Sequence, residues 1–320
     1  DDGLVEENIK NQQLVVLQER EQGYDEPHGR DWDALGDVSF SKEHPYHHSV
    51  IGTVADIEAF EIGKVRDFWA AHYRPSNAVL GLVGHFDSEE MLDRIEFWFS
   101  DLPDVGPAKP RITEQPQLPR PKAAGYIEDN VEDLTLYLAY PTVPLGHDDE
   151  PALELLSYVL SYGRDTRLDD RLYFDTNLAT DEGAFHYASD LDGSFLFYAT
   201  SPKTPLKKLD SVIKGVLEDT VKDPPNADEL KRAVQGVKTS MLDQLENPVD
   251  RAEMLVDCQR LKGNANCQVD DFARYEAVTT ADLVRVTQTY LLTDQLATLS
   301  VVPRGSARKA LPDSVEVVLK

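Results

Sequence analysis

Residues 134–140 read LTLYLAY, and Pro141 follows them. Leucine occupies the alternate positions 134, 136 and 138, which is the period of a β-strand that turns one face toward a core. Proline has no amide hydrogen to donate to a ladder, so we expect the strand to end at Pro141. The pattern predicts a β-sheet in the second half of the chain.

Further strands and amphipathic helices surround this stretch. Residues 182–189 and 194–200 are strand-like and are joined by Asp192-Gly193, a pair typical of hairpins. An apolar strand is predicted at 296–302, preceded by a helix that begins after Thr279 and runs to Tyr290. Helices are predicted at about 150–162, 165–175, 205–221, 227–245 and 249–262.

The first helix is predicted at residues 4–22, and one of its faces combines apolar and polar residues. At 100° per residue, its apolar side chains fall within one arc of about 140°. They are Leu4, Val5, Ile9, Val15 and Val16. Gln12 and Glu19 project from the centre of the same arc. A carboxylate on such a face needs a cation, a partner or solvent, so Glu19 is either a metal ligand or a carboxylate beside water.

A second helix is predicted after Thr53, with Asp56 placed to complete a capping box. The helix is expected to run to Arg74 and to bury its apolar face, and Trp98 is expected in the core of the next helix. The face comprises Ile57, Phe60, Val65, Phe68 and Trp69. An apolar strand is predicted at 78–84. This order resembles that of residues 279–302, about 220 positions later, which is a weak sign of two duplicated halves.

A proline-rich stretch separates the two halves. Six prolines lie between Pro103 and Pro121, a composition typical of an extended linker. We therefore expect the latter part of a first domain at 1–103, a linker at 104–124 and a second domain at 125–320.

Charge excludes two classes of partner. The 320 residues include 58 acidic and 32 basic side chains, for a formal net charge of −26. A nucleic-acid-binding protein needs a basic surface, and an anionic membrane surface would repel this chain. No apolar run approaches the roughly 20 residues that cross a bilayer. We expect no nucleic-acid partner and no membrane association.

Cys258 and Cys267 are the two cysteines, and the turn-forming residues 263–266 lie between them. The sequence leaves open whether they form a disulfide or remain two thiols. A disulfide would favour a periplasmic or secreted protein; free thiols would fit a cytoplasmic one.

The other candidate motifs do not indicate a metal site or a catalytic site. In His44-Pro45-Tyr46-His47-His48, Pro45 favours extended backbone, so the imidazoles do not share a helical face. We expect a surface loop there. The serines at 157, 161 and 194 lack a neighbouring His–Asp arrangement, and no phosphate or dinucleotide motif is present.

Five stretches together resemble the pitrilysin and mitochondrial-processing-peptidase family of inverzincin zinc metallopeptidases. Residues 11–20, NQQLVVLQER, resemble the helix that carries the third zinc ligand of that family. Their order and spacing along nearly the whole chain carry the resemblance. The other four stretches are HPY at 44–46 with VIGT at 50–53, YRPSNAVL at 73–80 with VG at 83–84, GRDTRL at 163–168 with RL at 171–172, and VTTADL at 278–283 with YL at 290–291.

The resemblance implies an α+β fold of two homologous domains, each an antiparallel-rich sheet with helices packed on one face, the first domain being incomplete here. It implies Zn²⁺ held by two histidines of an H-x-x-E-H helix and a downstream glutamate, with the motif's own glutamate as general base. Glu19 matches the downstream ligand, and Gln12 would support it. The sequence contains no H-x-x-E-H. We expect that motif upstream of Asp1, so no catalytic residue lies in this chain, and the fragment alone should be inactive.

The implied activity is zinc-dependent endopeptidase cleavage of extended peptides or unfolded proteins. The alternative is a non-catalytic scaffold or partner subunit of the same family. The Arg–Tyr pair with which family members hold substrate aligns with Tyr173 and Thr180, and neither position keeps the residue of the family. We therefore expect a homodimer or heterodimer in which a family member supplies that pair. The resemblance assigns no substrate-binding residue in this chain.

Overall fold

A computed structural model describes residues 4–103, 105–107, 122–163, 166–174 and 176–319. The chain divides into two compact units. Unit 1 comprises 1–10, 60–111 and 235–276, and unit 2 comprises 11–59, 112–234 and 277–320. Most of the predicted linker at 104–124 lies outside the described residues, so the predicted domain boundaries stay predictions.

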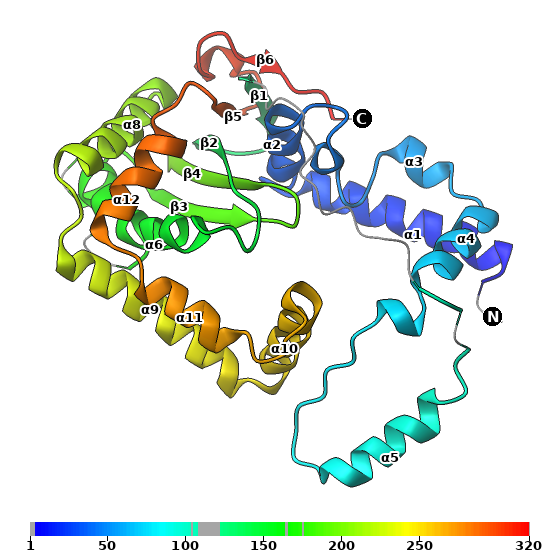
Figure 1. The fold of residues 1–320 in the computed structure, drawn as a ribbon. Helices are drawn as coiled ribbons and strands as arrows, with labels where there is room; N and C mark the ends of the chain where they lie inside the picture. The colour runs from blue at the N-terminus through cyan, green and yellow to red at the C-terminus, as the bar shows by residue number, and fades with distance from the viewer. Residues whose placement is uncertain (1–3, 104, 108–121, 164–165, 175, 320) are drawn as a thin grey trace. The chain divides into compact units, whose positions relative to one another are not determined.

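Unit 2 is built on a six-stranded sheet in the order β3-β4-β2-β5-β1-β6 (Figure 1). From β3 to β5, neighbouring strands are antiparallel, and β1 runs parallel to both β5 and β6. The α+β class and the antiparallel-rich sheet are thereby confirmed. The strands are β1 (Ala124–Asp129), β2 (Leu134–Thr142), β3 (Asp181–Ala188), β4 (Gly193–Ser201), β5 (Ala297–Pro303) and β6 (Val315–Glu316).

Helices cover both faces of this sheet. On one face, α6 (Glu150–Ser161) packs on β3 and α8 (Leu206–Lys222) packs on β2. On the opposite face, α2 (Asp31–Ser39) buries Leu35 and Val38 against β1, β2, β4 and β5. The alternating pattern of β2 predicts one buried face. Because α2 covers the second face, β2 is buried on both. Leu136 and Ala139, whose side chains lie on opposite faces, are both buried.

Pro141 does not end β2, contrary to the sequence prediction. It pairs with Ser194 of β4, and the strand continues to Thr142. Pairing with β5 stops at Ala139, opposite Ala297. Position 141 therefore has a neighbouring strand on one side only, which is where a sheet tolerates the missing amide hydrogen of proline.

The other helical elements follow the sequence closely. The predicted capping box at Thr53 is present, and the helix that begins after Thr279 has a second one. The helix after Thr53 is nevertheless interrupted, because α3 ends at Glu58 and α4 begins at Ile62. The elements are α1 (Glu6–Asp25), η1 (Pro45–His47), α3 (Val54–Glu58), α4 (Ile62–His72), η2 (Pro75–Asn77), α5 (Ser88–Phe99), α7 (Arg167–Asp169), η3 (Asp170–Phe174), α9 (Ala227–Glu246), α10 (Pro248–Lys262), α11 (Gln268–Glu276), α12 (Thr280–Val286), η4 (Thr287–Leu291) and η5 (Ala307–Lys309).

In unit 1 the strand predicted at 78–84 does not form. The segment lies against α10, since a Cβ atom added at Gly81 would come within 2.6 Å of Val256 Cγ2. Among the described residues it has no neighbouring strand. The core positions predicted for Phe68, Trp69 and Trp98 are also wrong in this chain, because all three side chains are exposed. Without a sheet to cover them, the apolar faces of α4 and α5 face solvent.

No helix in the described part of the chain is long and apolar enough to cross a bilayer.

Candidate functional site

Helix α1 presents Glu19 and Gln12 on an exposed face. Both side chains are exposed, as are Leu14 and Val15, while the neighbouring Arg20 is buried. Val15 projects from the same side of the helix as Glu19, which makes that exposed face partly apolar, whereas Leu14 projects from another side. The two predicted site residues do share one side of the helix, about two turns apart.

Two hydrogen bonds within unit 2 hold another side of α1. Gln13 Nε2 donates to the carbonyl of Ile57 at 2.8 Å. Arg20 Nε donates to the carbonyl of Gly52 at 3.1 Å, and its guanidinium carbon lies 4.1 Å from the centre of the Tyr24 ring. The two hydrogen bonds to Ile57 and Gly52 set the rotation of the helix about its axis, and thereby the direction of Glu19.

Tyr24 connects α1 to α2 through a hydrogen bond from its hydroxyl to Asp33 Oδ2. Burial, together with the Asp33 carboxylate, raises the pKa of Tyr24 to about 12. The phenol consequently stays protonated and remains a donor at physiological pH. Because α2 packs on the sheet, the position of α1 is tied to the core of unit 2.

Glu19 fits one ligand position of a zinc site but not a whole site. Catalytic zinc takes three protein ligands and leaves a fourth position for water. Among the described residues, the one group of three potential metal ligands is Cys258, Cys267 and Asp271. That group does not include Glu19, and both cysteines are bonded to each other. The described part of the chain therefore does not complete a site of three ligands at Glu19.

The histidine loop at 44–48 also does not converge on a metal. His44 is buried, with Nε2 at 3.6 Å from Asp192 Oδ2, and its Nδ1 accepts from the amide of Tyr46 at 3.0 Å. His47 Nε2 lies 3.5 Å from Asp37 Oδ1. The loop is not wholly a surface loop, as the sequence predicted, because His44 sits in the core of unit 2. Nothing local in the sequence points to Asp192, which is 148 positions away.

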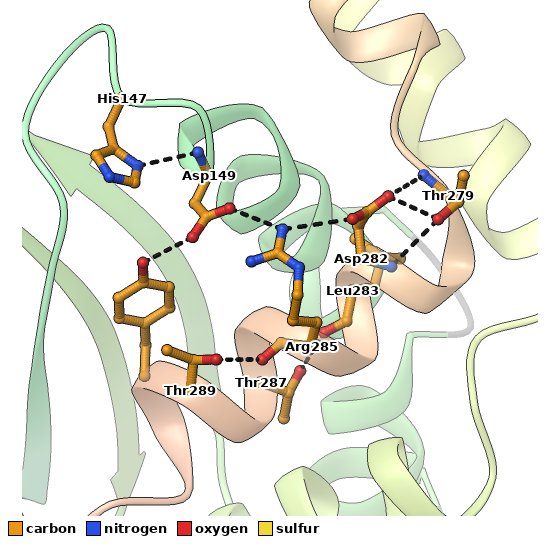
Figure 2. Close-up of polar contacts among 9 residues, drawn as sticks. His147, Asp149, Thr279, Asp282, Leu283, Arg285, Thr287 and Thr289 are labelled. Atoms are coloured by element: carbon orange, nitrogen blue, oxygen red, sulfur yellow. Dashed lines mark hydrogen bonds and ion pairs between the residues drawn. The ribbon is translucent and has the colours of Figure 1, made fainter.

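A second polar network ties α12 and η4 to the start of α6 (Figure 2). Arg285 Nη2 donates to Asp149 Oδ1 at 2.7 Å, and the Tyr290 hydroxyl donates to Asp149 Oδ2 at 2.7 Å. The hydrogen bond from Arg285 holds the pKa of Asp149 below its usual range. Asp282 accepts from the amide of Thr279 at 3.0 Å, which closes the capping box. Since each of these groups bonds another side chain or a helix terminus, the network is structural.

The positions aligned with the Arg–Tyr pair of the family carry no such pair. Tyr173 lies in the π-helical turn η3, and its side chain is exposed. Thr180 precedes β3, and its hydroxyl donates to the carbonyl of Thr200 at 3.2 Å. Neither side chain supplies the cation with which the family would hold a peptide backbone.

Cys258 and Cys267 form a disulfide in unit 1. Cys258 belongs to α10, and Cys267 immediately precedes α11. Of the two alternatives that the sequence left open, the disulfide is the one present. It closes the turn between the two helices.

Comparisons with known proteins identify the family. A family model described as the peptidase M16 inactive domain matches residues 59–237, more than half of the chain. The "Zinc protease PqqE" of Helicobacter pylori is 26% identical over 267 residues, which cover 81% of this chain and 59% of that protein. An uncharacterized zinc protease of Rickettsia bellii is 24% identical, with 74% of this chain and 56% of that protein covered. The chain thus spans a little over half of the curated relatives that it matches.

Solved structures share the fold. The crystal structure of a protease from Helicobacter pylori superposes with a TM-score of 0.80 at 24% identity, covering 93% of this chain and 73% of that one. The peptidase M16 inactive domain from Pseudomonas fluorescens also gives 0.80, at 20% identity and with 93% and 70% coverage. With the family model, these matches place the α+β architecture among the M16 peptidases. The chain belongs to the peptidase M16 family, and its residues 59–237 match the inactive domain of that family.

Proposed function

We propose that this chain is part of a zinc metalloendopeptidase that cleaves extended peptides or unfolded proteins, and that Glu19 is one of its zinc ligands. The observation that carries the proposal is the exposed face of α1. Glu19 projects from a face that also exposes Gln12 and Val15, while Gln13 and Arg20 anchor another side. Such a face suits a helix that contributes one ligand to a metal held mainly by another segment. The names of two relatives as zinc proteases support the metal.

The remaining ligands and the general base belong, in this proposal, to an H-x-x-E-H segment outside this sequence. Exposed apolar side chains in unit 1, among them Trp69, Leu80 and Trp98, support a further segment that covers them in the parent protein. Gln12 would support Glu19 from the preceding turns. Because one carboxylate cannot replace three ligands, the chain alone should hold no stoichiometric zinc and should show no peptidase activity.

Partner and compartment follow from two further observations. The sequence resemblance aligns Tyr173 and Thr180 with the Arg–Tyr pair of the family, so we expect a second family member to supply that pair in a homodimer or heterodimer. The Cys258–Cys267 disulfide supports a periplasmic or secreted location, since disulfides persist in oxidising compartments.

A non-catalytic scaffold or partner subunit is the second candidate. The match of residues 59–237 to a model of the inactive domain favours it. The two candidates differ in the parent protein: the peptidase binds about one zinc per active site, whereas the scaffold binds none.

The test uses the full-length parent and two matched variants of α1. Glu19→Gln keeps the size of the side chain but removes its charge, and Glu21→Gln makes the same change at another exposed position of the helix. We expect Glu19→Gln to lower zinc content and cleavage of an unstructured peptide together. Mutation of a residue that only supports a metal ligand typically costs about 10–100-fold in metal affinity or activity, so loss of the ligand itself should cost at least that much. Glu21→Gln should change neither. Full zinc and full activity in Glu19→Gln would contradict the proposal, and a parent without zinc would favour the scaffold.

A further inference from the structure

The disulfide of unit 1 lies beside a carboxylate group. Asp271 Oδ2 is 3.3 Å from Cys267 Sγ, and the two sulfur atoms and a carboxylate oxygen of Asp271 all lie within 4.8 Å of one another. In the described part of the chain, no other three histidine, cysteine, aspartate or glutamate side chains converge in this way. Two sulfurs and one carboxylate oxygen, with water in a fourth position, are a donor set that suits tetrahedral zinc.

The backbone already holds the two cysteines close enough to share one ion. Their Cα atoms are 5.4 Å apart. Two thiolates that bind one zinc at about 2.3 Å in a tetrahedral arrangement lie roughly 3.8 Å from each other. Once the bond between the sulfurs is broken, rotation of the two side chains about their Cα–Cβ bonds gives that separation. Helices α10 and α11 can therefore keep their places.

Two cations orient Asp271 through its other oxygen. Lys262 Nζ donates to Asp271 Oδ1, and Arg274 Nη1 lies 3.7 Å from the same oxygen. Oδ2 is the oxygen that faces the sulfur of Cys267. Partners of this kind fix the direction of a metal-binding carboxylate. Their positive charges also offset part of the negative charge of two thiolates and a carboxylate.

The surroundings of the sulfurs suit a bound cation in the reduced chain. Gln268 Nε2 donates to Cys258 Sγ at 3.7 Å, and Cys267 immediately precedes α11, whose N-terminus stabilises a thiolate. Both cysteines are buried. Burial disfavours a free thiolate, but a metal ion removes that cost, since it deprotonates a coordinating thiol outright.

We propose that reduction converts the Cys258–Cys267 disulfide into a zinc site, with the two thiolates and Asp271 as ligands and water in the fourth position. A dithiol reductant supplies two electrons and two protons: the bond between the sulfurs breaks, two thiols form, and the reductant leaves as its own disulfide. Binding of Zn²⁺ then releases the two thiol protons. The oxidised chain offers no thiolate, so it should still hold no stoichiometric zinc.

The probe is Co²⁺, which gives a charge-transfer band in the near ultraviolet when thiolates bind it and strong visible bands when it is tetrahedral. The whole chain is reduced with dithiothreitol, freed of reductant by gel filtration without oxygen, and titrated beside the oxidised chain. Thiol titration under denaturing conditions verifies the redox state of each sample. We expect about one Co²⁺ per reduced chain, displaced by Zn²⁺, and none per oxidised chain. A reduced chain without the thiolate band would overturn the inference.

Matched variants test the ligand set. Asp271→Asn keeps the size of the side chain and removes its charge, so it should weaken Co²⁺ binding by the reduced chain at least about 10-fold. Asp270→Asn, the same change at an exposed neighbouring position of α11, should leave the affinity within about twofold. Cys258→Ser with Cys267→Ser should abolish the thiolate band. Equal affinities in the two aspartate variants would contradict the assignment of Asp271.

Hydrogen exchange gives a second readout. Zn²⁺ should slow exchange in α10 and α11 of the reduced chain, because an ion that binds only the folded form stabilises it, and should leave the oxidised chain unchanged. Exchange that zinc does not slow in the reduced chain would contradict the inference. The proposed peptidase site uses Glu19, which belongs to unit 2, so either proposal can fail while the other stands.

Discussion

Similar aromatic side chains are buried in unit 2 and exposed in unit 1. Phe197, in β4 of unit 2, is completely buried, whereas Phe97, in α5 of unit 1, is 73% exposed. Both lie in regular elements with apolar neighbours. The difference is that Phe197 has strands on both sides and helices above it, whereas the described part of unit 1 contains no sheet. The sequence pattern therefore predicts which face of a segment is apolar. Whether that face is buried depends on whether another helix or a sheet packs against it.

The same contrast separates residues 78–84 from β2. Each is an apolar stretch that the sequence predicts as a strand, but β2 pairs with β4 and β5. Residues 78–84 approach α10 at Gly81 and leave Val79, Leu80 and Leu82 exposed. A strand is stable only as part of a sheet, so the second stretch stays irregular in this chain.

The largest expected effect comes from one substitution made in each unit. Phe197→Ala should lower the free energy of unfolding of unit 2 by about 3–5 kcal/mol, because it leaves a cavity in a packed core. Phe97→Ala should change the stability of the chain by no more than about 0.5 kcal/mol, as is usual at exposed sites. Urea unfolding followed by circular dichroism measures both. Similar losses in the two variants would mean that unit 1 has a core comparable to that of unit 2.

Removal of the disulfide should act on unit 1 alone. The bridge joins residues nine positions apart, so the chain-entropy model gives about 2–3 kcal/mol of stabilisation. In the double variant Cys258→Ser with Cys267→Ser, hydrogen exchange in α10 and α11 should speed up, while exchange in β2 should not. Titration of thiols under denaturing, non-reducing conditions is the control. Two reactive thiols per chain would show that the bridge does not form.

A smaller effect concerns acid stability of unit 2. Burial lowers the pKa of His186 to about 4, below the value of about 6.5 in an unfolded chain. The unfolded state therefore binds the proton more readily, and stability that is fully present above pH 6.5 is lost as the pH falls through 4. We expect a loss of about 1–3 kcal/mol from this residue, measured by urea unfolding between pH 7 and pH 4. His186→Gln should flatten that dependence, and an unchanged slope would contradict the assignment.

The smallest effect is expected at the network of Figure 2. Arg285 is half-exposed, so solvent screens its attraction to Asp149. Arg285→Met should cost about 0.5–1 kcal/mol and should raise the pKa of the Asp149 carboxyl, which NMR titration measures. Arg94→Met, which removes an exposed pair with Glu90, should cost less. A pKa of Asp149 that does not move would show that Arg285 does not hold it.

The sequence predicts local features of this fold well and long-range ones poorly. The hairpin around Asp192-Gly193, the helices α8 to α10, the capping box at Thr53 and the start of α12 after Thr279 depend on neighbouring residues, and the sequence predicts them within a few positions. By contrast, α2 and the short strands β1 and β6 were missed, since they depend on a distant sheet. The burial of His44 beside Asp192 likewise depends on residues that are distant in the sequence.

In the candidate site, too, the sequence predicts the local arrangement but not the long-range contacts. Spacing on a helix is local, so the sequence predicts that Glu19 and Gln12 share a face, and the structure places them together. The described residues bring no set of three ligands together at Glu19, so its role as a zinc ligand stays a prediction. The sequence does not predict the contact between Trp32 and Phe185, because the two rings approach each other only once α2 has packed on the sheet.

Hydrogen exchange at residues 79–83 tests most directly whether unit 1 is completed by a segment outside this sequence. In the chain alone, we expect these amides to exchange within minutes while those of β2 stay protected for hours or longer. In the full-length parent, both stretches should be protected. Residues 79–83 as protected as β2 in the chain alone, or unprotected in both proteins, would contradict the account.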